Sequence, residues 1–179
     1  MERRLILMRH AKSSWDLSPA RDFDRPLNKR GREAAPAMGA ALATRWFTPD
    51  LILCSPAART RETLALILPA LSPEPRTSFR ERLYLADVDR LMAEIAATDP
   101  EIRKLLVLGH NPGIQELALH LADPARSAVS DLRDIEGKFP TAAIAAFALE
   151  ASDWGGVSPG TGELLAFLTP KRLADPAET

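Results

Sequence analysis

The chain has 179 residues, 46% of them hydrophobic, and its 23 basic and 24 acidic residues leave a net charge of −1. This length fits one domain spanning residues 1–179, and the hydrophobic content suffices for a buried core, which excludes a disordered chain. The charge balance gives no support to a nucleic-acid-binding protein, and no apolar run is long enough for a membrane span or a signal peptide, so we expect a cytoplasmic protein.

Short apolar runs alternate with helical segments along the chain. The first run, residues 5–8, predicts a strand buried on both faces, and after a polar loop Asn28 is placed to cap a helix over residues 29–47, which Pro36 and Gly39 weaken. Further strands are predicted at 51–54, 105–108, about 142–149 and 164–168, and further helices at 57–68, 88–97 and 114–121. The alternation predicts an α/β fold, a three-layer sandwich with a mainly parallel central sheet flanked by helices.

Some residues and segments are expected to be structural. Cys54, the only cysteine, ends an apolar run and is interpreted as a small buried hydrophobe, and one cysteine excludes both an intramolecular disulfide and a cysteine-based zinc site. The polar residues 123–138 are interpreted as an insertion or flap, and the tail after about residue 170 is expected to be mobile. Packing positions, rather than a ligand cage, are expected for Trp15, Trp46 and Trp154, and His120 is interpreted as a surface or packing residue.

Three of the predicted strands end abruptly in basic or small polar residues. The first is followed by Arg9 and His10, the second by Ser55 with Arg59 one helical turn on, and the third by His110. Two of the three histidines in the chain therefore lie at strand ends. Because ligands bind at the carboxyl ends of parallel strands, and arginine forks suit phosphate oxygens, these residues indicate phosphoryl transfer.

Three motifs in this order resemble those of a known family. Residues 7–15, Leu-Met-Arg-His-Ala-Lys-Ser-Ser-Trp, resemble the Arg-His-Gly box of the histidine phosphatase superfamily, which includes the cofactor-dependent phosphoglycerate mutases. Residues 55–63, Ser-Pro-Ala-Ala-Arg-Thr-Arg-Glu-Thr, and residues 109–111, Gly-His-Asn, are similar to its second and third motifs. With Asp-Arg-Pro-Leu-Asn-Lys-Arg-Gly at 24–31, they most resemble the short SixA-type phosphohistidine phosphatases. The resemblance implies a phosphoglycerate mutase-like fold.

The resemblance also assigns a role to each of four residues. His10 is the expected nucleophile, which attacks phosphorus in its neutral form to give a phosphohistidine intermediate. Arg9, Arg59 and His110 are expected to surround the phosphoryl oxygens and to stabilise charge in the transition state. Because these residues supply the positive charge, we expect no metal ion and no cofactor, and the sequence contains neither an HExxH cluster nor a P-loop.

The general acid and the substrate contacts have competing interpretations. Glu81, followed by Arg-Leu-Tyr, is similar to the glutamate of the mutases that protonates an ester leaving group, or it lies on a solvated loop edge. The SixA-type enzymes lack a clear equivalent. Lys12, Ser13 and Arg25 are either substrate contacts or solvated loop residues. Asp16 stands where mutases have a phosphate-facing asparagine, and it is left out of the site because a carboxylate would repel phosphate.

The spacing of the motifs bears on the substrate. The segments between them are too short to enclose a small metabolite, so we expect an open site that removes phosphate from phosphohistidine on a partner protein and releases inorganic phosphate. One alternative is a phosphatase or mutase acting on a small phosphoester metabolite. Another is a non-catalytic phosphate-dependent binding module, although binding alone would not need the nucleophile.

Overall fold

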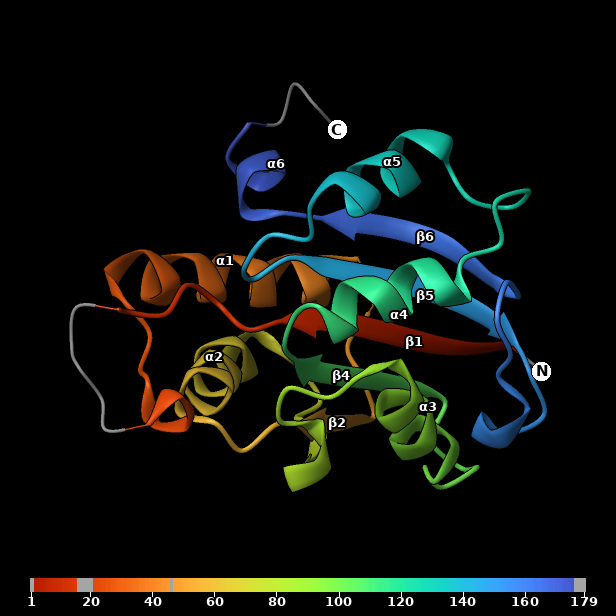
Figure 1. The fold of residues 1–179 in the computed structure, drawn as a ribbon, viewed down its shortest axis with the longest axis horizontal. Coiled ribbons are helices and arrows are strands. Elements are labelled where there is room, and N and C mark those ends of the chain that lie inside the picture. Colours follow the sequence, from red (N-terminus) through yellow and green to blue (C-terminus); the bar gives the residue numbers. More distant parts are fainter. Residues whose placement is uncertain (1, 16–20, 46, 176–179) are drawn as a thin grey trace.

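A six-stranded sheet forms the centre of the domain, and the structure, a computed structural model, describes residues 2–15, 21–45 and 47–175. The strands span Glu2–Arg9 (β1), Leu51–Cys54 (β2), Arg76–Phe79 (β3), Lys104–Gly109 (β4), Ile144–Glu150 (β5) and Gly162–Leu168 (β6). They lie in the order β3-β2-β4-β1-β5-β6 (Figure 1). Neighbours among β1 to β4 pair in parallel, whereas β5 runs antiparallel to both β1 and β6.

Helices cover both faces of this sheet. They span Lys29–Thr44 (α1), Ala58–Ile67 (α2), Val88–Ala96 (α3), Gly113–Leu121 (α4), Val129–Gly137 (α5) and Pro170–Ala174 (α6). Because side chains alternate along a strand, Leu5 and Leu7 of β1 pack with α3 and α4, whereas Ile6 and Met8 pack with α1 and α2. The predicted three-layer α/β sandwich with a mainly parallel sheet is therefore confirmed.

Most predicted elements form close to their expected bounds. The Asn28 side chain caps α1, since it accepts a hydrogen bond from the Gly31 backbone N–H at 2.9 Å. Pro36 lies inside this helix on its exposed side, and α1 ends at Thr44 rather than at residue 47. Cys54 is fully buried, and burial raises the pKa of its thiol to about 12, which fits a structural cysteine.

Three elements differ from the expectation. The edge strand β3 consists of exposed or half-buried residues, so it lacks the apolar run by which the other strands were predicted. The polar segment 123–138 contains α5, which buries Ile135. The tail beyond residue 170 begins with α6, and Arg172 in this helix forms ion pairs with Asp131 and Asp134 of α5. Asp16 and Trp46 lie outside the described residues.

The loop after β1 is fixed against α1 and α2. At Gly31, a Cβ atom would lie 2.2 Å from the Lys12 carbonyl oxygen, so the close approach of loop and helix requires glycine. The Ala11 backbone N–H donates to the Thr63 hydroxyl of α2 at 2.9 Å. These contacts hold the backbone that directly follows His10 against the two helices. No helix within the described residues is long and apolar enough to cross a membrane.

Candidate active site

Three neighbouring strands bring the predicted residues to one edge of the sheet. The register pairs Arg9 of β1 with Gly109 of β4, so His10 and His110 emerge side by side, with ring centroids 5.3 Å apart. Strand β2 lies on the other side of β4 and ends at Cys54, which places Ser55 next to His110. Parallel strands that end together thus assemble a polar cluster from segments far apart in the sequence.

The hydrogen bonds of His10 fix its tautomer. Its Nδ1 lies 2.7 Å from the Ala11 carbonyl oxygen, and because a carbonyl only accepts, Nδ1 must carry the ring proton. The Nε2 atom then holds a free electron pair, toward which the Arg59 Nε–H points at 3.3 Å. The backbone N–H of Ala142, a non-glycine residue with a φ of 66°, donates to the carbonyls of Arg9 and His10 and holds this end of β1 in place.

Both histidines are neutral over the physiological range. Burial is the main cause that lowers the pKa of His10, to about 3, and the charges of Arg59 and Arg9 lower it further. The hydrogen bond to Ala11 acts in the opposite direction but does not outweigh them. Burial, the neighbouring His10 and then Arg59 lower the pKa of His110 to about 3 as well. A neutral imidazole with its free electron pair on Nε2 is the form of His10 that can attack phosphorus.

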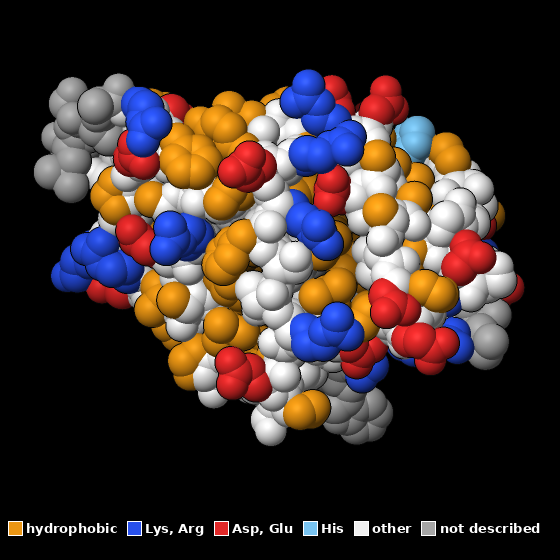
Figure 2. Space-filling view, turned by 90° about the horizontal axis from the view of Figure 1, so that it is seen from below, with side chains coloured by type: hydrophobic (Ala, Val, Ile, Leu, Met, Phe, Trp, Pro, Cys, Tyr) orange, Lys and Arg blue, Asp and Glu red, His pale blue; other side chains and the backbone are white. Residues whose placement is uncertain are grey.

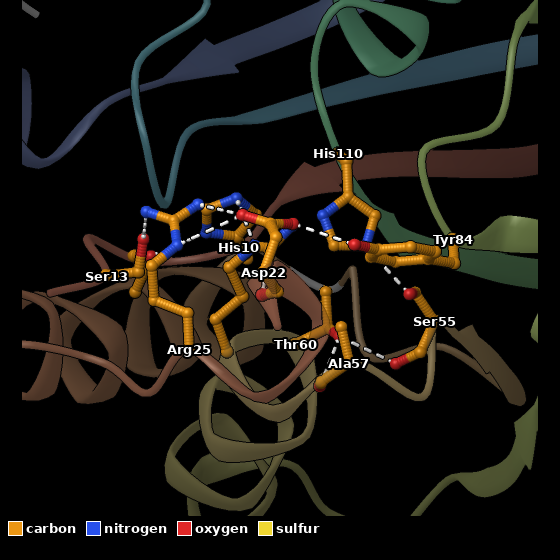
Figure 3. A network of polar contacts seen from close by, with 11 residues as sticks. His10, Ser13, Asp22, Arg25, Ser55, Ala57, Thr60, Tyr84 and His110 are labelled. Atoms are coloured by element: carbon orange, nitrogen blue, oxygen red, sulfur yellow. Dashed lines mark hydrogen bonds and ion pairs between the residues drawn. The ribbon is translucent and has the colours of Figure 1, made fainter. Parts of the chain in front are cut away.

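Arg59 lies beside His10 and is engaged by the loop after β1. Its guanidinium is 1% exposed and donates to the Asp22 carbonyl at 2.8 Å and to the Asp22 carboxylate at 3.0 Å. The same carboxylate accepts from the Tyr84 hydroxyl at 2.8 Å and pairs with Arg25 at 3.0 Å (Figure 3). Burial acts to raise the pKa of Asp22, but the hydrogen bond from Tyr84 and the charge of Arg59 outweigh it and lower that pKa. The Asp22 carboxylate therefore occupies the position at the Arg59 guanidinium that phosphate oxygens would take.

His110 has one ring nitrogen held and one available. Its Nε2 lies 2.7 Å from the Ser55 hydroxyl, and its buried Nδ1 has no partner within the described part of the chain. When the Ser55 hydroxyl donates to Nε2, the ring proton resides on Nδ1 and can be donated to a phosphoryl oxygen. The Tyr84 ring meets His110 edge-on, with centroids 5.4 Å apart, and packs it against the site.

Arg9 also has a hydrogen-bond donor to spare. One terminal nitrogen donates to the Phe139 carbonyl at 2.8 Å, whereas its buried Nε has no partner among the residues the structure describes. Burial, and then the charge of Arg59, lower the pKa of Arg9, but an arginine stays charged at neutral pH. An anion in the site would supply the missing partner for Nε and relieve the repulsion between the two arginines.

A cavity of about 320 Å³ opens onto these groups. Its lining includes Arg9, His10, Arg59 and His110, and also the three loop residues predicted as substrate contacts or solvated residues, Lys12, Ser13 and Arg25. Of those three, Lys12 is exposed, whereas Arg25 is buried, donates to the Ser13 hydroxyl at 2.7 Å and stacks on Trp15 at 3.6 Å. Trp15 is 76% exposed, so the packing predicted for it is limited to this stack, whereas Trp154 is buried as predicted.

Glu81 does not line the cavity. It is an exposed residue that begins a 3₁₀ helix, Glu81–Leu83, and only the residues that follow, Tyr84 and Leu85, reach the site. The structure thus favours the solvated-edge interpretation of Glu81. Sequence reasoning missed Asp22 and Tyr84, and gave no role to Ser55. The second motif contained Ser55, but nothing in the sequence indicated that the loop folds back to bring Asp22 onto Arg59.

A substitution at Glu81 tests this placement. Because the carboxylate lies outside the cavity, Glu81→Gln should change kcat/KM on both alkyl and aryl phosphates by less than about twofold, whereas loss of a general acid costs about 10²–10⁴-fold on the poorer leaving group. Steady-state rates on the two esters measure this directly. A strong, selective loss on the alkyl ester would return Glu81 to the site.

The neutral histidines also make stability depend on pH. An unfolded histidine binds a proton below about pH 6.5, whereas folded His10 and His110 do so only near 3, so acidification favours the unfolded chain in this window. Between pH 6.5 and 5, each histidine should lower the free energy of unfolding by about 2 kcal/mol. Urea denaturation at the two pH values should therefore show a smaller loss in the free energy of unfolding for His10→Gln than for the wild type. An equal difference in both proteins would contradict the lowered pKa.

Known proteins resemble this chain over nearly its whole length. The SixA protein of Nakamurella multipartitia superposes with a TM-score of 0.81 at 32% identity, covering 95% of this chain and 97% of that one. The structure of a protein histidine phosphatase SixA complexed with tungstate gives a TM-score of 0.75 at 25% identity, over 95% and 99% of the chains. An uncharacterized protein of Mycobacterium tuberculosis is 36% identical over 164 residues, which are 92% of this chain and 100% of the relative.

The fold, two adjacent histidines and two arginines define a phosphatase with a phosphoglycerate mutase-like α/β fold. The family model of the histidine phosphatase superfamily, branch 1, matches residues 5–146, and the chain belongs to this superfamily. Its solved neighbours make it SixA-like. Within the described residues, no group of three or more histidine, cysteine, aspartate or glutamate side chains is placed to hold a metal ion.

Proposed function

We propose that this protein removes phosphate from phosphohistidine on a partner protein, using His10 as nucleophile and needing no metal ion or cofactor. The observation that carries the proposal is the absence of an available proton donor for an ester: among the described residues, the only carboxylate that lines the cavity is Asp22. Asp22 is ion-paired with two arginines, and its lowered pKa keeps it deprotonated at neutral pH.

In the first step, the Nε2 electron pair of His10 attacks phosphorus in line with the bond that breaks. The substrate imidazole carries a proton on its remote nitrogen and departs as a neutral ring with the electron pair of the broken P–N bond. His10 becomes a phosphorylated imidazolium that keeps its proton on Nδ1, where the Ala11 carbonyl accepts it. One imidazole thus replaces another on phosphorus, and neither transfer needs an acid from the protein.

In the second step, water attacks phosphorus and the N–P bond of His10 breaks. The bond electrons return to Nε2, so the neutral ring is restored, and the phosphoryl group with the water molecule becomes dihydrogen phosphate. In this mechanism Arg9 Nε, the Arg59 guanidinium and His110 Nδ1–H donate to the three phosphoryl oxygens throughout, a role supported by the unpartnered Arg9 Nε and His110 Nδ1. For Arg59 to do so, its two hydrogen bonds to Asp22 must give way to phosphate.

A small phosphoester is the second candidate substrate, and the cavity distinguishes the two. An alkoxide leaves with difficulty unless a group protonates it, and within the described ranges the only carboxyl group that lines the cavity is Asp22, whose pKa is lowered. The cavity also opens at the surface beside the exposed Trp15, so a side chain on another protein can reach His10. Both features favour phosphohistidine over an alkyl ester.

Competition between the two substrate types tests the proposal. A phosphohistidine protein and a set of sugar and glycerate phosphates are supplied together, and kcat/KM for the phosphohistidine protein should exceed that for each ester by about 10²-fold or more, in line with the usual contribution of a missing general acid. An aryl phosphate, which leaves with less help, should fall between them. A metabolite ester that outcompetes phosphohistidine would overturn the substrate and leave the chemistry at His10 intact.

A further inference from the structure

A second, larger hollow adjoins the catalytic cavity. It has a volume of about 630 Å³ and shares Arg9, Lys12 and Thr141 with the cavity, so the two form one continuous depression. Its other basic residues, Arg30, Lys138 and Lys171, come from three different segments: α1, the residue after α5, and α6. We call this hollow the basic groove.

The charge of the basic groove is one-sided. Five basic residues line it against one acidic residue, Glu33, which is within 3.8 Å of Lys29 on the same helix. The nearby carboxylates of α5, Asp131 and Asp134, share the single positive charge of Arg172, so this group contributes only one net negative charge. The protein as a whole has a net charge of −1, so this positive region is a local concentration.

The face at the opposite edge of the sheet has a mixed surface. Figure 2 views the molecule from below, from the side on which the sheet ends at β3, and there basic, acidic and hydrophobic side chains are interspersed. The basic groove lies toward the other edge, among α1, α6 and the segment leading into β5. A concentration of one sign beside a reactive site raises the local concentration of ligands of the opposite sign.

Two exposed hydrophobic residues stand at the mouth of the catalytic cavity. Trp15 is 76% exposed and Leu85 is 53% exposed, and both line the cavity. Leu85 has a φ of 48°, a left-handed conformation that costs a leucine free energy. An aromatic and an aliphatic side chain at the mouth, with basic residues adjacent, are typical of a surface that contacts a protein.

We propose that the basic groove binds an acidic surface of the phosphohistidine-bearing partner while its phosphohistidine occupies the catalytic cavity. The proposal rests on the function proposed above and names the chemistry of the partner. Basic residues from three segments, spread over a wide open hollow, fit the distributed carboxylates of a protein surface better than one small anion. Complementary charge of this kind mainly accelerates association and is weakened by salt.

Defined peptides and one double variant test the proposal. Two phosphohistidine peptides are compared at low ionic strength, one flanked by Asp and Glu and one in which these are Asn and Gln. The wild type should have an approximately tenfold higher kcat/KM on the acidic peptide, and about 0.5 M salt should remove the preference. Arg30→Glu combined with Lys138→Glu should abolish the preference and leave kcat/KM on a small aryl phosphate within about twofold of the wild type.

A charge-matched variant serves as the control. Arg76→Glu with Arg90→Glu makes the same charge change on β3 and α3, away from the basic groove, and should keep the preference. If the wild type hydrolyses both peptides equally, the groove proposal fails while the proposed function stands. If the Arg30→Glu, Lys138→Glu variant loses as much kcat/KM on the aryl phosphate as on the acidic peptide, the groove proposal also fails, because the two charges would then act on the catalytic cavity. If neither peptide is hydrolysed but a small ester is, the proposed function itself fails.

Discussion

Replacing His10 by alanine should reduce turnover of every substrate by about 10⁴-fold or more, the scale on which loss of a catalytic nucleophile acts. The expectation follows from the position of Nε2, whose free electron pair is fixed by the proton that Nδ1 donates to Ala11. No other described residue combines a free electron pair with a place between Arg59 and His110. Initial rates on an aryl phosphate and on a phosphohistidine peptide measure the loss.

His120 offers a matched control for this substitution. It is the third histidine of the chain, and it is exposed on α4. His120→Ala should retain activity within about twofold, since exposed substitutions away from a site have small effects. Circular dichroism should show both variants folded. A His10→Ala protein that keeps more than about a tenth of the wild-type rate would contradict nucleophilic catalysis at this residue.

Substituting Arg59 should have the second largest effect. Arg59→Ala removes the buried guanidinium next to His10 and should lower kcat about 10²–10³-fold, as expected for loss of one preorganised donor to the transition state. Arg59→Lys keeps the charge but loses the planar fork, so it should recover only part of the rate. Single-turnover kinetics with an aryl phosphate would separate this loss from weakened binding.

Arg61 provides the control on the same helix. It is exposed and lies near the Phe79 ring, away from the cavity, so Arg61→Gln should keep the wild-type rate within about twofold. Thermal unfolding of each variant shows whether the fold is retained, because Arg59 also anchors the loop that carries Asp22. An Arg59→Ala enzyme within threefold of the wild type would remove this arginine from the transition state.

The strands and the core of the site could be predicted because each depends on local signals. Buried parallel strands are continuous apolar runs in the sequence. Functional side chains such as His10 and His110 come directly after these runs, because ligands bind at the carboxyl ends of parallel strands. Their proximity also requires that β1 pairs with β4, which the sequence alone did not specify. The edge strand β3 was not predicted because none of its residues is buried and its sequence contains no apolar run.

The remainder of the site depends on tertiary contacts that leave no trace in a local pattern. Asp22 lies in a polar loop, and only the folded chain brings its carboxylate to Arg59, Arg25 and Tyr84. The motif resemblance suggested Glu81 as an acid because it precedes an aromatic residue, yet the backbone directs Tyr84 and Leu85, rather than Glu81, toward the cavity. Side-chain direction after a short 3₁₀ helix cannot be deduced from spacing alone.

Trapping the covalent intermediate tests the central claim most directly. The wild-type protein is mixed with a substrate carrying a radioactive phosphoryl group, quenched within milliseconds in alkali, where phosphohistidine survives, and digested for peptide mapping. We predict that the label resides on Nε2 of His10, appears in a burst before steady state and is absent from His10→Ala. Label on another residue, or release of phosphate with no labelled protein at any time, would contradict nucleophilic catalysis by His10.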